Sequence, residues 1–178
     1  MKGESHLSPG LIVFTDGKAE FEVAFEQSAL KSALSLCASS PRAETGGILV
    51  GRYVDGGRRA AVFEATGPPP GSSAGRDWFK RGNRGLAQLL VTRWNSEPRT
   101  YYLGEWHYHT DRIPWPSPQD LHQMREVAGD PRYQCTNPIL LVVSPVEEGR
   151  WCPQLFVFGT GMSPVALLMV DDPQGNGS

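Results

Sequence analysis

The stretch Tyr101-Tyr102-Leu103-Gly104-Glu105-Trp106-His107-Tyr108-His109 is apolar and aromatic for most of its length and carries two imidazoles near its end. We interpret it as a β-strand, in which side chains two residues apart point to the same face. His107 and His109 can therefore reach one metal ion together. An unpaired polar ring is costly to bury among apolar neighbours, which favours a ligand role for this pair over simple packing.

A second part of the pattern follows closely, at Ser117-Pro118-Gln119-Asp120. We expect a helix to begin here, with Ser117 as the N-cap and Pro118 at the first helical position. Asp120 then occupies the third position, where the positive end of the helix favours an ionised carboxylate, the form that a metal binds. The same four residues are also an ordinary capping sequence, so a purely structural role is the alternative.

Three protein ligands would leave the fourth position of a tetrahedral zinc ion open to water, which is typical of catalytic zinc. Such a site also needs a general base. The candidate is Glu44, which opens the strand Glu44-Thr45-Gly46-Gly47-Ile48-Leu49-Val50-Gly51 directly after a predicted helix and its loop. Gly46 and Gly47 would let another backbone or a ligand approach closely. The alternative is a solvated carboxylate at the start of a strand.

Glu44 with its glycine-containing strand, His107-x-His109, Ser117 and Asp120 together resemble the JAMM motif of the MPN-plus (JAB) zinc metalloprotease family. The resemblance extends over residues 20–160, and the segment 102–107 is particularly similar to the prokaryotic branch. One difference is visible. Many members have proline after the second histidine, where this chain has threonine and aspartate. The shape of the following loop is therefore open, whereas the ligand set is complete.

The resemblance implies one Zn²⁺ per chain, held by His107, His109 and Asp120, with Glu44 activating water and Ser117 donating a hydrogen bond to the reacting group. It also implies an α/β (α+β) fold: a single JAMM/MPN domain with a mixed, curved β-sheet packed by helices, in a cytidine-deaminase-like architecture. We expect a flexible N-terminus at residues 1–10, the metalloprotease domain at 11–170 and a disordered tail at 171–178.

The resemblance further implies a function, since family members are mostly isopeptidases that remove ubiquitin or ubiquitin-like proteins. The expected reaction is hydrolysis of the bond after the C-terminal glycine of a ubiquitin-like protein, which frees a target lysine or matures a precursor. Its extended tail could add as a strand beside a sheet edge near the site. Small prokaryotic members occur beside E1-like and E2-like enzymes, including antiviral ones, so a bacterial conjugation or antiphage defence system is the expected setting. A processing protease for a sulfur-carrier protein and a non-catalytic MPN scaffold are the alternatives.

The composition agrees with a compact enzyme and disfavours other classes. With 39% hydrophobic and 20% charged residues, a chain of 178 residues predicts one globular domain. A net charge of -2 and a pI near 6.1 give no basic surface of the kind that nucleic acid requires. No apolar run approaches the length of a membrane span, and residues 1–6 lack the apolar core of a secretion signal, so we expect a cytoplasmic protein. Cys37, Cys135 and Cys152 form no Cys-x-x-Cys pair and lack the signature of a catalytic thiol, which disfavours a cysteine isopeptidase.

Hydrophobic periodicity predicts the elements in the order βαββαβαβββ, which is typical of a mixed sheet packed by helices. Predicted strands lie at residues 21–25, 47–54, 59–65, 101–109, 137–144, 154–159 and 165–170, with a short edge strand at 11–14. Predicted helices lie at 26–39, at 83–94 and from 117 onward. The second helix should bury a core stripe made of Leu86, Leu89, Leu90 and Trp94. The sequence Asp55-Gly56-Gly57 predicts a hairpin turn.

Residues 67–75 form a polar, proline-rich loop, which is followed by Arg76-Asp77-Trp78-Phe79-Lys80-Arg81. Loops of this length are usually functional or mobile. One interpretation is a surface loop whose Trp78 and Phe79 pack back into the core. The other is a wall of a substrate site, since aromatic and arginine side chains are enriched where proteins bind partners.

Overall fold

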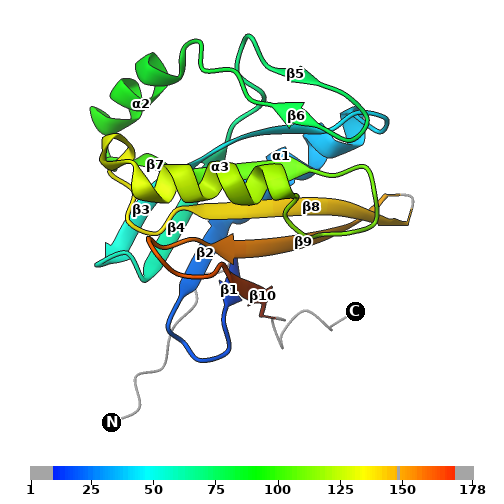
Figure 1. Ribbon diagram of the computed structural model, residues 1–178. Helices are drawn as coiled ribbons and strands as arrows, with labels where there is room; N and C mark the ends of the chain where they lie inside the picture. The colour runs from blue at the N-terminus through cyan, green and yellow to red at the C-terminus, as the bar shows by residue number, and fades with distance from the viewer. Residues whose placement is uncertain (1–9, 148, 171–178) are drawn as a thin grey trace.

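The computed structural model describes residues 10–147 and 149–170 (Figure 1). The strands are β1 (Leu11–Thr15), β2 (Glu22–Glu26), β3 (Thr45–Asp55), β4 (Arg59–Ala65), β5 (Ser73–Ala74), β6 (Phe79–Lys80), β7 (Tyr101–Tyr108), β8 (Ile139–Glu147), β9 (Arg150–Val157) and β10 (Val165–Met169). The helices are α1 (Gln27–Ser39), α2 (Leu86–Trp94), α3 (Pro118–Gly129) and the 3-10 helix η1 (Pro131–Tyr133). The tails predicted at residues 1–10 and 171–178 lie outside the described residues, apart from Gly10.

Eight strands form one mixed sheet that closes on itself in the order β1-β10-β9-β8-β7-β3-β4-β2, with β2 paired back to β1. The β2–β4 and β7–β8 pairs are parallel, and the other pairs are antiparallel. The expected α+β fold with a mixed, curved sheet is confirmed. The expectation of an edge strand at residues 11–14 is wrong, because β1 pairs with β2 on one side and with β10 on the other. Pairing between distant segments leaves no mark in the periodicity of so short a strand.

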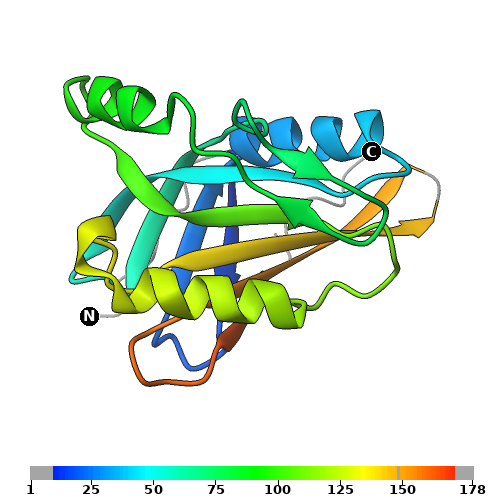
Figure 2. The same cartoon turned by 45° about the horizontal axis from the view of Figure 1, so that its top comes forward.

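Helices α1 and α3 lie on opposite sides of the sheet, with α1 packed against β2, β3 and β4 and α3 packed against β8 (Figure 2). Leu141 packs into the core that contains residues of α1, whereas Leu140 and Val142 pack with Met124 of α3. Both faces of β8 are therefore buried, which explains why its sequence is continuously apolar instead of alternating. The helices expected at residues 26–39 and from 117 onward are confirmed, and each has buried residues facing the sheet.

The core stripe expected on α2 is confirmed only in part, because Leu86, Leu89 and Leu90 pack against a buried cluster of the sheet whereas Trp94 does not belong to it. Leu86, Leu89 and Leu90 are only partly buried, Trp94 is 50% exposed, and none of the nine residues of α2 is fully buried. The helix lies at the periphery and packs against β7, with no second layer above it (Figures 1 and 2). Helical spacing predicts which side chains share a face, but it does not tell how deeply the fold buries that face.

The hairpin between β3 and β4 forms where the turn sequence predicted it. Gly56 and Gly57 adopt φ angles of 48° and 90°, which glycine reaches without a steric penalty. Arg58 N–H donates to the Asp55 carbonyl at 3.0 Å and closes the turn. Farther along, the proline-rich loop leads into a small hairpin of β5 and β6, in which Phe79 is buried and Trp78 is 44% exposed. The expected packing into the core is thus confirmed for Phe79 and wrong for Trp78, and a substrate wall stays a prediction.

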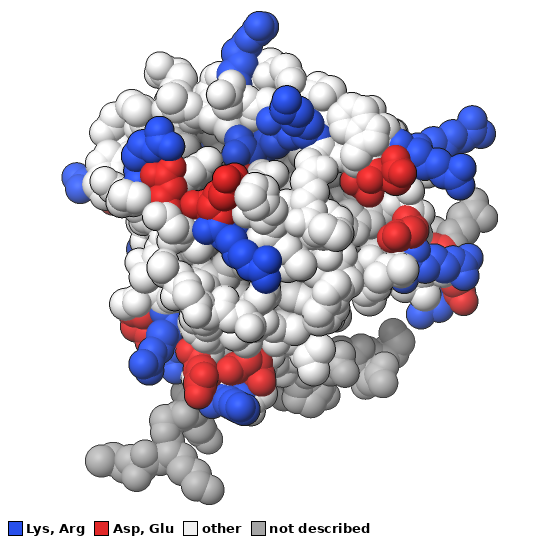
Figure 3. Space-filling view, in the orientation of Figure 1, with Lys and Arg blue, Asp and Glu red and all other residues white. Residues whose placement is uncertain are grey.

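The surface is mixed in charge. On the face shown in Figure 3, basic and acidic residues lie next to one another in small mixed groups, with uncharged surface between the groups. None of the helices in the two described ranges combines the length and hydrophobicity needed to cross a lipid bilayer.

A β-bulge in β7 sets the geometry around the two histidines. In the pairing of β3 with β7, Leu49 lies opposite Gly104 and Val50 lies opposite Tyr102, so that Leu103 is an extra residue in β7. Gly104 has a φ of 153°, and a Cβ built on it would lie 1.8 Å from the Ile139 carbonyl oxygen of β8. Glycine is therefore required at this position.

The bulge shifts the alternation of side chains along β7 by one residue. Leu103 and Trp106 belong to the core that α1 covers, whereas Tyr102 packs with Ile48 in a separate cluster on the other face. Tyr102 consequently lies on the same face as Glu105, and its hydroxyl donates to the Glu105 carboxylate at 3.3 Å. Without the extra residue, the strand would place these two side chains on opposite faces.

Candidate metal centre

The two histidines are held at the end of β7 by backbone pairing. His107 lies within the strand and pairs in register with Val142 of β8. His109 follows the strand, but its N–H still donates to the Val143 carbonyl at 2.9 Å, which extends the parallel pairing past the last strand residue. Both side chains are buried, with exposed fractions of 4% and 8%. They point to the same side, as their spacing predicts.

The third residue of the set comes from the first turn of α3, which begins as the sequence predicts. Ser117 is the N-cap, and its Oγ accepts a hydrogen bond from Asp120 N–H at 3.1 Å. Asp120 Oδ2 in turn accepts from Ser117 N–H at 2.7 Å, which completes a capping box. The capping interpretation is therefore correct, and it is compatible with a ligand role because it fixes the carboxylate in the direction of the histidines.

The structure brings the three predicted ligand residues together. Asp120 Oδ1 lies 2.6 Å from His107 Nδ1, and Asp120 Oδ2 lies 3.1 Å from His109 Nε2. One ligand atom from each of the three side chains lies within 4.8 Å of the other two. Two imidazoles and one carboxylate in this arrangement form a donor set that suits zinc.

The charges of these groups provide a test of whether a cation fits here. Burial alone would lower the pKa of His107, but its hydrogen bonds to Asp120 and Glu105 outweigh burial and raise the pKa to about 9. Burial would raise the pKa of Asp120, but its hydrogen bonds to both histidines hold it far below the usual range. Both shifts show that positive charge is favoured beside the Asp120 carboxylate, and a bound metal cation would supply such a charge. The donor set fits a divalent ion.

Glu44 lies beside this cluster, immediately before β3. Its backbone N–H donates to the Gly75 carbonyl at 2.8 Å, which ties it to the β5–β6 hairpin. Burial raises the pKa of Glu44 to about 7, while the neighbouring His109 lowers it and Asp120 raises it. A carboxyl group with a pKa near neutrality is suited to accept and return a proton. Glu44 also lines a cavity of about 350 Å³ together with the proline-rich loop.

The two glycines after Glu44 are approached by backbone. A Cβ on Gly46 would lie 2.4 Å from the Trp106 carbonyl oxygen of β7, and a Cβ on Gly47 would lie 2.1 Å from the Thr66 carbonyl oxygen. The close approach that the sequence predicts is therefore made by neighbouring chain segments, and it keeps β3 tightly packed beside the two histidines.

The loop after His109, whose shape the missing proline leaves open, is tied to the opposite side of the site. Thr110 Oγ1 donates to the Arg76 carbonyl at 2.6 Å, so this loop meets the β5–β6 hairpin. Ile113 and Trp115 on the loop are 61% and 58% exposed, and Trp78 on the hairpin is 44% exposed. Both segments thus offer apolar surface to a partner.

Sequence reasoning missed one residue of this region, Glu105. Its side chain is completely buried, and its Oε2 lies 3.3 Å from Nε2 of His107. A carboxylate two residues before a candidate ligand histidine, inside an otherwise apolar strand, is the signal that could have identified it. Among its other partners, Tyr102 lies in the same strand, whereas Arg81 and Gln123 come from distant segments and leave no such signal.

Comparisons with known proteins identify the family of the chain. The family model described as "Prokaryotic homologs of the JAB domain" matches residues 26–154. A protein of Enterobacter hormaechei subsp. hoffmannii (strain UCI 50) named "CD-NTase/cGAS isopeptidase" is 34% identical over 164 residues, which cover 92% of this chain and 90% of that protein. The solution structure of a Desulfitobacterium hafniense protein matches with a TM-score of 0.51 at 18% identity, over 83% of this chain and 88% of that one, and supports the fold alone. The chain therefore belongs to the prokaryotic JAB family.

Proposed function

We propose that this protein is a zinc-dependent isopeptidase that hydrolyses the bond after the C-terminal glycine of a ubiquitin-like protein. The observation that carries the proposal is the convergence of His107, His109 and Asp120 beside Glu44. The isopeptidase name of the Enterobacter relative supports the same reaction class. Because that name refers to CD-NTase/cGAS, we further propose that the lysine belongs to an enzyme of that class in a cytoplasmic antiphage conjugation system with E1-like and E2-like partners.

His107, His109 and Asp120 would hold the zinc ion and leave one position for water. Zinc bound there would supply a water that ionises near neutral pH and a positive charge that polarises a carbonyl group. Glu44 accepts the proton of the attacking water as the new carbon–oxygen bond forms. It returns this proton to the departing lysine amine as the carbon–nitrogen bond breaks, so one carboxyl group serves as base and then as acid.

Ser117 is positioned to stabilise the oxyanion that forms during attack. Its oxygen already accepts a hydrogen bond from Asp120 N–H, which orients the side chain. Among the described residues, Asp120 is the hydrogen-bond partner of this hydroxyl, and its carboxylate is the group that a bound cation would engage. With Asp120 bound to the cation, the hydroxyl proton would be available to a substrate oxygen.

Replacing Ser117 with alanine is expected to lower kcat by about a hundredfold to a thousandfold, through loss of this donor. The change also removes the N-cap and should cost about 1 kcal/mol of unfolding free energy. Steady-state cleavage and urea unfolding measure the two effects. Ser117→Gly separates them, since glycine caps almost as well as serine but has no hydroxyl. Ser117→Thr retains both properties. Equal activity in the glycine and threonine variants would remove the oxyanion role.

A tail of extended conformation would need a strand edge near the site. The main sheet offers no free edge there, because β3, β7 and β8 each pair on both sides. Within the described residues, the strands beside the site with a free edge are those of the β5–β6 hairpin. We therefore propose that the tail pairs with this hairpin, which also explains its connections to Glu44 and Thr110.

Parallel assays of two substrates distinguish the candidate functions. The substrates are bacterial ubiquitin-like proteins that end in Gly-Gly. Each is tested as a linear C-terminal fusion and as a conjugate on a lysine of a CD-NTase-class enzyme. We expect at least one conjugate to be cleaved more than about tenfold faster than its fusion, with loss of cleavage on chelation. Cleavage of a sulfur-carrier fusion alone would indicate a processing protease. Bound zinc with no cleavage of any substrate would indicate a scaffold.

A further inference from the structure

The Glu105 carboxylate has four side-chain partners, although no part of it reaches solvent. Oε1 accepts from Arg81, with Nε at 3.0 Å and Nη2 at 2.9 Å, and from the Tyr102 hydroxyl at 3.3 Å. Oε2 accepts from Gln123 Nε2 at 2.7 Å and lies 3.3 Å from His107 Nε2. The partners come from β7, from α3 and from the segment after β6, so the carboxylate is fixed by three separate parts of the fold.

These contacts determine how the His107 ring is oriented. Nε2 faces Glu105, and Nδ1 faces Asp120 at 2.6 Å. When Nε2–H donates to Glu105, the lone pair of Nδ1 points to the place where Asp120 and His109 converge. Phe79 packs against the ring in an edge-on arrangement with a centroid distance of 5.6 Å, which opposes rotation. A flipped ring would lose both hydrogen bonds.

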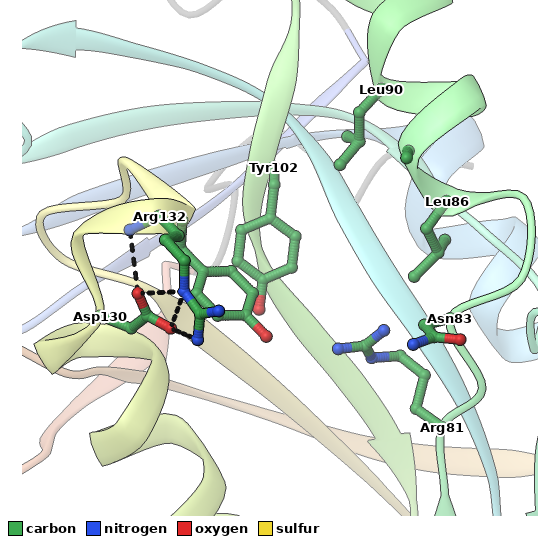
Figure 4. Close-up of a pocket in the computed structure, with 9 residues that line it drawn as sticks. Arg81, Asn83, Leu86, Leu90, Tyr102, Asp130 and Arg132 are labelled. Carbon is green, nitrogen blue, oxygen red and sulfur yellow. Dashed lines mark hydrogen bonds and ion pairs between the residues drawn. The ribbon is translucent and has the colours of Figure 1, made fainter.

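The buried Glu105 carboxylate stays ionised because it is paired with the Arg81 guanidinium. An unpaired buried carboxylate would cost several kcal/mol, and the guanidinium offsets this cost with two N–H groups on one oxygen. Arg81 lies immediately after β6 and reaches inward beside Tyr102 at the edge of a 490 Å³ cavity below α2 (Figure 4). Arg81 thereby links the β5–β6 hairpin, which borders the site, to the orientation of the His107 ring.

We propose that Glu105 is a positioning residue that presets the metal site: held by Arg81 and Gln123, its carboxylate fixes the His107 ring with Nδ1 toward Asp120 and His109. Glu105 acts through the His107 ring and is not one of the three candidate ligands. Its effect is that the ring needs no rearrangement when zinc arrives. Carboxylates that orient metal-bound histidines in this manner typically contribute tenfold to a hundredfold to metal affinity or activity. This proposal depends on the proposed function only for the identity of the metal.

The test measures zinc affinity without any substrate, by competition of the full-length protein with a chromophoric chelator. Glu105→Gln keeps the size of the side chain and removes its charge, and we expect the zinc dissociation constant to rise by about tenfold to a hundredfold. The matched control is Glu64→Gln. Glu64 pairs with Arg93 through two contacts of 2.7 and 3.2 Å, but this pair touches no candidate ligand. The control variant should bind zinc like the original protein.

A second variant covers the case in which Glu105→Gln fails to fold. Gln123→Met removes the donor to Oε2 and leaves the Arg81 pair intact, and it should weaken zinc binding by about threefold or more. Nitrogen NMR of the loaded original protein should show the His107 proton on Nε2. Unchanged zinc affinity in the folded variants, with only a lower unfolding midpoint, would reduce Glu105 to a structural role. Absence of zinc binding in the original protein would instead overturn the proposed function.

Discussion

The Glu44→Gln variant is expected to cleave its substrate about a hundredfold to ten-thousandfold more slowly than the original protein while still binding zinc. Glutamine has nearly the same size but cannot accept the proton of the attacking water. The candidate ligands His107, His109 and Asp120 are unchanged, so the zinc content of the purified variant should stay near one ion per chain. Single-turnover cleavage and metal analysis measure both quantities. Near-normal cleavage by the zinc-loaded variant would exclude Glu44 as the base.

The same substitution should stabilise the metal-free protein. Burial raises the pKa of Glu44 from 4.5 to about 7 in the folded state. Below pH 4.5 both states carry the proton. Between pH 4.5 and 7 the unfolded chain releases it while the folded chain retains it, so the free energy of unfolding falls as the pH rises. Above pH 7 the penalty is constant. Because the side chain is partly solvated, we expect Glu44→Gln to gain on the order of 1 kcal/mol at pH 8 and nothing at pH 4.

The Gly104→Ala variant is expected to lose roughly 3–5 kcal/mol of unfolding free energy, enough to leave a large part of the chain unfolded. The new Cβ would meet the backbone oxygen of Ile139 at 1.8 Å, and neither strand can withdraw without breaking the β7–β8 pairing. Urea unfolding measures the loss. Gly129→Ala is the control, because a Cβ on Gly129 at the end of α3 would meet nothing within 4 Å. An unchanged midpoint for Gly104→Ala would mean that the bulge can relax.

The three ligand residues could be identified from the sequence because their geometry is local. His107 and His109 follow the bulge, and from Glu105 onward the simple alternation of a strand holds. The position of Asp120 depends on the first turn of α3, which Ser117 and Pro118 define without help from the rest of the fold. For these residues, nearby sequence determines local backbone, and local backbone determines where the side chains point.

The Glu105 network could not be identified in this way. Arg81 and Gln123 meet Glu105 across 24 and 18 residues of sequence, and no local pattern joins them. This dependence on distant segments also explains two differences between the predicted and the observed fold. The pairing of β1 with β10 and the shallow packing of α2 both depend on which distant segments become neighbours, and periodicity within one element carries no record of that.

The closure of the sheet has a consequence for any shortened form of this protein. The family match ends at residues 26 and 154, so β1, nearly all of β2 and all of β10 lie beyond it. A chain cut to that segment would leave β4 and β9 with rows of unpaired amide and carbonyl groups along their outer sides. Such rows recruit strands from other molecules and lead to aggregation. The three outlying strands therefore cover the two edges that the matched segment would otherwise expose.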